Sequence, residues 1–113
     1  MKLPSAHIVA RAEDSVTLDI VIPAADEAFA GHFPRYPILP GVVQTDWAVR
    51  FAAHYLGTGL ATVRDLRIKF RQPVLPDMAF CLTLTFKRAT QRLSFVYAVG
   101  DIELSSGQMH LGA

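Results

Sequence analysis

The chain has 113 residues, a formal net charge of +1 and an apolar share of 51%. This length predicts a single domain over residues 1–113, because it allows one core and is too short for two. The near-neutral charge excludes a bulk electrostatic attraction to nucleic acid or membranes, and the single cysteine, Cys81, excludes an internal disulfide.

The N-terminal segment does not resemble a signal peptide, because Pro4, His7 and Arg11 interrupt the apolar run that one would need. No segment approaches membrane-spanning length. We therefore expect a soluble, cytoplasmic protein that binds neither nucleic acid nor membrane. No Cys/His cluster has zinc-ligand spacing, so no metal site is expected. The apolar share is high for so small a chain, which indicates that part of the surface meets another subunit.

A β-hairpin is predicted at the N-terminus. Its strands are residues 6–11 and the sequence SVTLDIVI at 15–22, joined by the turn AEDS. In the second strand Val16, Leu18 and Ile20 alternate with polar residues, which predicts one buried face.

Residues 41–56 are predicted to form the one substantial helix, which ends at Gly57 and Gly59. Apolar residues cover almost its whole circumference, so we expect a helix buried on all sides. Asp46 lies in its first two turns among valines and Trp47, where burial would disfavour the ionised carboxylate.

Beyond the helix the apolar period changes to two, which predicts strands near residues 65–71, 79–87, 93–99 and 102–111. The apolar parity of the last strand changes between Leu104 and Met109, which suggests a bulge near Gly107. One buried helix wrapped by a curved antiparallel sheet of five to six strands is the α+β hotdog fold. A ferredoxin-like fold would need a second long helix that the pattern does not contain.

The loop before the helix, GHFPRYPILPG, contains three prolines that stiffen it. His32 is the side chain in this loop that titrates near neutral pH, so it is a candidate general base. Gly41 opens the helix, where a free N–H can stabilise an enolate-like oxygen. With Asp46 as the acid, these groups suit the elimination of water from a 3-hydroxyacyl group.

Simpler interpretations exist for the same residues. A histidine near Gly and Pro is most often a turn residue. Asp46, Arg50 and His54 are spaced at i, i+4 and i+8, so a salt-bridged stripe also explains the aspartate. We assign no role to His7, His54 or His110.

The stretch GHFPRYPILPGVVQTDW resembles the active-site signature of the β-hydroxyacyl-acyl carrier protein dehydratases of the FabA/FabZ type. His32 matches that family's catalytic histidine, Gly41 its helix-start glycine and Asp46 its acid. The second stretch, IKFRQPVLPDM, is similar to the strand and turn that follow the helix in the family. The two matches extend over roughly residues 30–78.

The resemblance implies a hotdog dimer in which each active site takes the histidine from one subunit and the acid from the other. Arg35 replaces the glycine that commonly follows His-Phe-Pro, and the acid is aspartate, as in the FabA type. The Asp-Trp version of the motif is similar to the small ApeI-like dehydratases of aryl-polyene and related pigment clusters. The implied product is a trans-2-enoyl thioester, in fatty-acid or aryl-polyene type biosynthesis.

The resemblance also implies an acyl carrier protein as partner and no cofactor of the enzyme's own, since phosphopantetheine arrives with the substrate. Phe29, Phe33 and Trp47 are candidates for lining the acyl tunnel, with Arg35 at its mouth. Three further cations form a candidate docking patch for the acidic carrier or its phosphate, although such a ladder is more often only a solvated strand face: Arg67, Lys69 and Arg71.

Two alternatives to a hydro-lyase remain open. The first is a hotdog acyl thioesterase, which would release a free thiol. The second is a catalytically silent, acyl-carrier-binding subunit of a heterodimer. Whether the partner is a second copy or a related hotdog subunit is not decided by the sequence.

Overall fold

The computed structural model describes residues 2–30, 37–59 and 62–112. Over these ranges it contains one α-helix, one short 3-10 helix and six strands. Their bounds are β1 Ala6–Ala12, β2 Ser15–Val21, η1 Glu27–Phe29, α1 Gly41–Leu56, β3 Thr62–Phe70, β4 Ala79–Lys87, β5 Arg92–Val99 and β6 Ile102–Gly112. The predicted hairpin and helix are confirmed, while β3 begins three residues earlier than predicted. None of the helices in these ranges is both long and apolar enough to cross a membrane.

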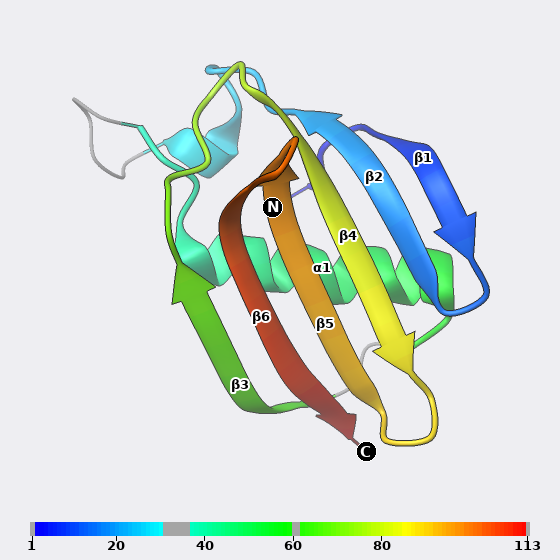
Figure 1. Ribbon diagram of the computed structural model, residues 1–113. Helices are drawn as coiled ribbons and strands as arrows, with labels where there is room; N and C mark the ends of the chain where they lie inside the picture. The colour runs from blue at the N-terminus through cyan, green and yellow to red at the C-terminus, as the bar shows by residue number, and fades with distance from the viewer. Residues whose placement is uncertain (1, 31–36, 60–61, 113) are drawn as a thin grey trace.

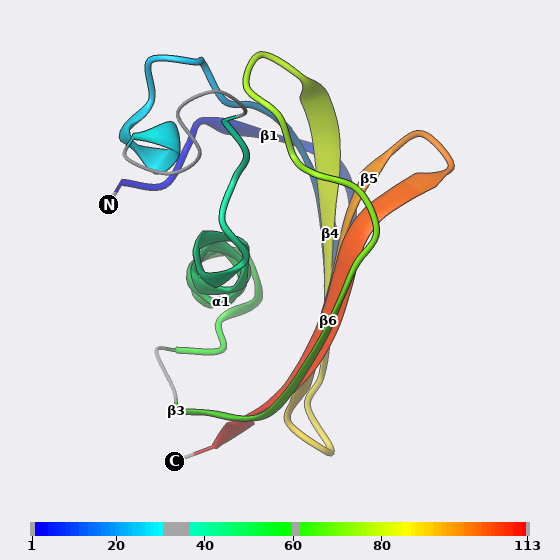
Figure 2. The same cartoon turned by 90° about the vertical axis from the view of Figure 1, so that its left-hand side faces the viewer.

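The six strands form one antiparallel sheet in the order β1-β2-β4-β5-β6-β3 (Figure 1). The sheet curves, and α1 lies in its concave side, as the view along the helix shows (Figure 2). This arrangement confirms the predicted hotdog fold. β1 and β3 are the two edge strands, so β3 has an unpaired backbone edge beside the helix.

The core lies between the concave face of the sheet and one face of α1. Alternate residues of β2, β4 and β5 point into it, as period-two patterning requires. The helix contributes a buried stripe at i, i+3 and i+4 spacing. Its buried apolar side chains are Trp47, Ala48, Val49, Phe51, Ala52 and Leu56.

The prediction that α1 is buried on all sides is wrong for the single chain. Val42 is 77% exposed, and Asp46 and His54 are also exposed. These residues follow one another at four- and eight-residue spacing, so they line the helix face that points away from the sheet. A single sheet covers only one side of a helix. The apolar residue at the start of the opposite side, Val42, is therefore left exposed in the single chain.

The bulge predicted near Gly107 lies elsewhere. In the pairing of β5 with β6, Tyr97 is opposite Ser105 and Ala98 is opposite Glu103, which leaves Leu104 as the extra residue. Gly107 is regularly paired with Phe95. The position requires glycine because a Cβ there would collide with the ring of Phe95. The change of parity therefore comes from a bulge three residues earlier than the glycine.

Two arginines, one in β1 and one in the turn directly after β4, hold the C-terminal end of α1. Arg11 donates from Nη2 to the carbonyl of Tyr55 at 2.8 Å, and Arg88 donates from Nη2 to the carbonyl of Leu56 at 2.6 Å. Gly57 follows with φ of 65°, the left-handed conformation that ends many helices. The cations satisfy carbonyls that the helix itself leaves free, which fixes α1 along the sheet.

Candidate active site

The start of α1 presents backbone donors that the helix itself leaves without an acceptor. Pro40 is the N-cap and has no side chain that can accept a hydrogen bond. The N–H groups of Val43 and Gln44 both donate to the carbonyl of Pro40, at 3.1 and 3.0 Å. The N–H groups of Gly41 and Val42 have no acceptor within the helix, and they lie at the positive end of its dipole. This position suits a carbonyl oxygen that gains negative charge.

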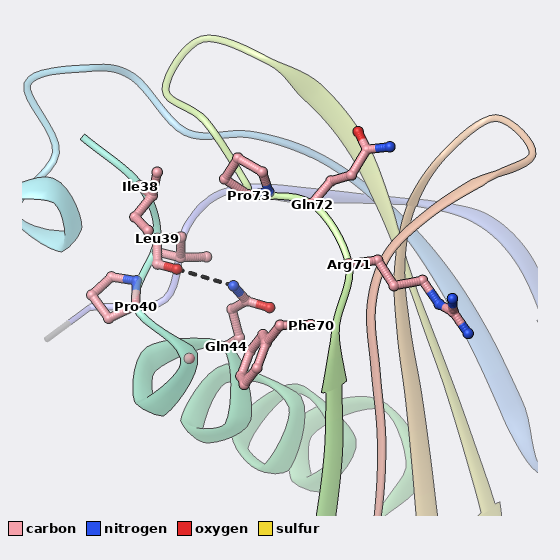
Figure 3. Close-up of a pocket in the computed structure, with 9 residues that line it drawn as sticks. Ile38, Leu39, Pro40, Gln44, Phe70, Arg71, Gln72 and Pro73 are labelled. Carbon is pink, nitrogen blue, oxygen red and sulfur yellow. Dashed lines mark hydrogen bonds between the residues drawn. The ribbon is translucent and has the colours of Figure 1, made fainter. Parts of the chain in front are cut away.

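A buried polar network fixes the segment that leads into this helix start. The side-chain amide of Gln44 donates to the carbonyl of Leu39 at 3.0 Å, as Figure 3 shows. Its oxygen accepts a 2.6 Å hydrogen bond from the hydroxyl of Ser105. The backbone N–H of Leu39 in turn donates to Val74 at 2.9 Å. Residues 39–41 are thereby anchored to the helix, to β6 and to the β3–β4 connection.

Tyr97 adds a third bond to the network. Its hydroxyl donates to the backbone carbonyl of Gln44 at 2.7 Å. Burial raises the pKa of the Tyr97 hydroxyl well above its usual value, and the negative charge of Asp46 raises this pKa further. Tyr97 therefore stays protonated and acts as a fixed donor.

This network was not predicted from the sequence, although one signal for it was present. Gln44 precedes Ala48 by four residues and Phe51 by seven, so helical spacing places it on the buried face. Gln44 and Ser105 are the buried polar residues in the described core, and an amide in such a position needs partners. The identity of the partners depends on β5 and β6, which are distant in sequence.

Two open, largely apolar cavities meet at Gly41. The first has a volume of about 610 Å³ and is lined by Ile38, Leu39, Pro40, Gly41, Gln44, Phe70, Arg71, Gln72 and Pro73 (Figure 3). The second has a volume of about 570 Å³ and is lined by Gly41, Val42, Thr45, Asp46, Val49, Val63, Leu66, Ile68 and Phe70. Gly41 and Phe70 are the two residues that line both.

Asp46 lies in the wall of the second cavity, one turn beyond Gly41 on the same helix. The side chain is 53% exposed, and its carboxylate lies 3.3 Å from the guanidinium of Arg50. The expectation that apolar neighbours bury this carboxyl is therefore wrong for the single chain. The predicted ion pair at i, i+4 is present, whereas His54 instead packs its ring edge-on against Tyr55.

The other predicted site residues fall into two groups, those outside the described residues and those in the core. His32, Phe33 and Arg35 lie outside the described residues, so the structure does not place them. Phe29 is buried in η1 and Trp47 is fully buried in α1. Neither lines the two cavities at Gly41. The indole N–H of Trp47 has no acceptor among the residues that the structure describes.

The three cations of the predicted docking patch are exposed at the edge of the sheet. Arg67 and Lys69 lie on β3, and Arg71 follows it. Together they line a cleft of mixed polar and apolar character on the outer face of the sheet, and Arg71 also lines the first cavity. Arg71 is partly neutralised, because its Nε lies 2.7 Å from the carboxylate of Glu103.

Comparisons with known proteins agree with this architecture. Residues 9–108 match the ApeI-like family, described as ApeI dehydratase. Over 93 residues the chain is 33% identical to the 3-hydroxyacyl-acyl-carrier-protein dehydratase FabZ of Chlamydia trachomatis, an alignment that covers 72% of this chain and 61% of that protein. The chain thus spans about three-fifths of the length of this curated relative.

Two solved structures extend the comparison. The chain superposes on one chain of the dehydratase heterocomplex ApeI:P from Xenorhabdus doucetiae with a TM-score of 0.89 and 28% identity, covering 100% of this chain and 100% of that chain. Thioesterase superfamily member 2 from Mus musculus matches with a TM-score of 0.67 and 13% identity, over 95% of this chain and 82% of the other. At that identity the second likeness shows the fold alone.

Proposed function

Because the chain belongs to the ApeI-like dehydratase family, we propose that it eliminates water from a 3-hydroxyacyl thioester carried on an acyl carrier protein. The product is a trans-2-enoyl thioester. The family assignment and the Asp-Trp form of the motif favour an aryl-polyene type pathway over housekeeping fatty-acid synthesis.

The observation that carries this proposal is the helix start at Gly41. Its N–H has no acceptor within the helix, and it lies where two apolar cavities meet, with a carboxylate one turn further along. A thioester carbonyl bound there would receive a hydrogen bond that strengthens as the oxygen becomes enolate-like. The buried Gln44 network keeps that donor in place, so little reorganisation is needed during the reaction.

The steps of the proposed reaction balance without a metal or a redox cofactor. His32 takes the α-proton, and the electrons of that C–H bond move toward the carbonyl, whose oxygen is held by Gly41 N–H. The C2–C3 double bond then forms as the bond from C3 to the hydroxyl oxygen breaks. Asp46 supplies the proton with which that hydroxyl departs as water.

A second subunit is part of this proposal, because the face that carries Asp46 is open in the single chain. Val42, Leu66 and Phe70 are exposed apolar side chains around it, and β3 has a free edge. A partner seated there would exclude water from Asp46 and favour its protonated form. The ApeI:P neighbour is a dehydratase heterocomplex, which supports a second copy or a related hotdog subunit as the partner.

The carrier protein is proposed to dock on Arg67, Lys69 and Arg71. These cations adjoin the first cavity through Arg71, so a phosphopantetheine arm held at the patch could extend toward Gly41. An acidic carrier surface complements this charge.

A spectrophotometric assay tests the proposal and separates it from its alternatives. Incubation with a 3-hydroxyacyl pantetheine thioester should produce the ultraviolet absorbance of a conjugated enoyl thioester, with no thiol detected by a thiol reagent. His32→Ala and Asp46→Asn should each abolish the signal, with correct folding checked by circular dichroism. Release of thiol without enoyl product would indicate a thioesterase, and neither signal would indicate a silent subunit.

Mixing the two inactive variants tests the shared site. If each site combines His32 of one subunit with Asp46 of the other, co-refolding His32→Ala with Asp46→Asn restores one intact site per mixed dimer. Activity that does not return in mixtures shown to form dimers would mean that both groups act within one chain, or that the natural partner is a different subunit.

A further inference from the structure

We infer that Phe70 is a specificity-determining residue, which restricts the substrate to acyl groups that are unbranched beside the thioester. This inference rests on the proposed function, because it takes Gly41 as the place where the thioester carbonyl binds. It concerns the width of the acyl group at C2 rather than its length.

The ring of Phe70 lies directly on Gly41. A Cβ built on Gly41 would overlap the end of this ring, so no space for a side chain remains between the two residues. Phe70 projects from the last position of β3 toward the start of α1, as Figure 3 shows. The glycine is needed for this close approach as well as for its N–H.

The same ring is the wall between the two cavities. Phe70 and Gly41 are the residues that both cavities share, and the remaining lining residues differ. A thioester held at Gly41 with its two ends in different cavities must therefore pass beside this ring. This holds whichever cavity takes the pantetheine arm and whichever takes the acyl chain.

Phe70 differs from the core aromatic residues in how it is held. Its backbone is fixed by pairing with Ser105 of β6, whereas the side chain is 59% exposed. The ring therefore contributes little to the core of the single chain, and its size can be changed with limited effect on folding. Its contact with Gly41 is the feature that its replacement would remove.

A straight acyl chain carries only hydrogens on C2 and can pass such a ring, whereas a methyl group on C2 adds width at the point of closest contact. One methyl or methylene group in an apolar site changes selectivity by about 10- to 200-fold. We therefore expect the wild-type protein to prefer a straight 3-hydroxyacyl thioester over its 2-methyl counterpart by at least about tenfold in kcat/KM.

Phe70→Ala is the test, with Leu66→Ala as the matched control. Leu66 is also an exposed apolar residue of β3, but of the two cavities it lines only the second, and the atoms nearest to a Cβ on Gly41 belong to Phe70. Phe70→Ala should reduce the preference for the straight substrate by about tenfold or more, while Leu66→Ala should leave it unchanged. Both variants should keep their circular dichroism spectra, and because both residues lie on the proposed partner face, their oligomeric state is compared with that of the wild type by size-exclusion chromatography.

A binding measurement makes the result independent of turnover. Unreactive amide analogues of the straight and 2-methyl acyl pantetheines can be titrated by calorimetry into the wild type and both variants. The same change in preference is expected in the affinities. If the wild type dehydrates straight substrates but Phe70→Ala changes neither ratio, the inference about Phe70 is wrong and the proposed function stands. If the wild type neither dehydrates nor binds any of these compounds, the proposed function fails and the inference with it.

Discussion

Removal of one hydroxyl, in Ser105→Ala, should destabilise the protein more than its small size suggests. Ser105 is fully buried, and its hydroxyl is the donor to the side-chain oxygen of Gln44, at 2.6 Å. Gln44 is itself only 3% exposed, so water cannot easily replace the lost donor. A buried polar group left without a partner costs about 1–3 kcal/mol. We expect that loss in the free energy of unfolding, measured by urea titration, and a lower melting temperature.

A double-mutant cycle with Gln44→Met identifies the cause. The single change Gln44→Met leaves two groups without their partner, the carbonyl of Leu39 and the hydroxyl of Ser105. In the double variant the Ser105 hydroxyl is absent as well, so it is not left without a partner. The losses in unfolding free energy of the two single variants should therefore sum to about 0.5–3 kcal/mol more than the loss of the double variant. Ser106→Ala is the control, because Ser106 makes a longer, 3.3 Å contact with Glu103 and is less buried. Two results would contradict this account: a free energy of unfolding for Ser105→Ala within about 0.5 kcal/mol of the wild-type value, or losses of the two single variants that sum to the loss of the double variant.

Three further predictions concern the ends of the helix, the buried tyrosine and the docking patch. Arg88→Ala should lower the free energy of unfolding by about 1–2 kcal/mol, because it frees the part-buried carbonyl of Leu56; no change in a urea titration would contradict this. Since the pKa of Tyr97 is raised in the folded state, its contribution to stability is complete below pH about 10. Above that pH the tyrosine of the unfolded state loses its proton first. The difference in unfolding free energy between wild type and Tyr97→Phe, measured by urea titration at alkaline pH, should therefore shrink by about 1.4 kcal/mol per pH unit. A difference that stays constant with pH would refute the burial argument. Substituting glutamate for both Arg67 and Lys69 should weaken binding of an acyl carrier protein by roughly tenfold at low ionic strength and far less at high salt. An equal loss of affinity at the two salt concentrations would argue against electrostatic docking.

The fold was predictable from the sequence because its signals are local. Alternation in residues 15–22 and 79–87, and the breaker-free stretch that ends at Gly57, identify the strands and the helix directly. The position of the bulge was not predictable in this way. Leu104 and Ser105 are both buried because β6 is paired with β5 and β3 at once, and the register of those pairs is a property of the whole sheet.

The candidate site was predictable in part. The spacing of Pro40, Gly41 and Asp46 predicted that Gly41 begins a helix and that Asp46 lies in its first two turns, and α1 has both residues at these positions; their catalytic roles stay predictions. The environment of Asp46 was not predictable, because a helix with apolar residues all round does not reveal which face is left for a partner. The contact of Phe70 with Gly41 was also missed, since it joins residues 29 positions apart through the curvature of the sheet.

The most direct test of the central claim is the mass of a 3-hydroxyacyl group on its carrier protein before and after incubation with the purified protein. Intact-protein mass spectrometry should show the loss of one water from the acyl carrier with wild type, and no loss with His32→Ala or Asp46→Asn. An unchanged mass across straight acyl chains of several lengths, both with the protein alone and with a related hotdog subunit added, would contradict the account.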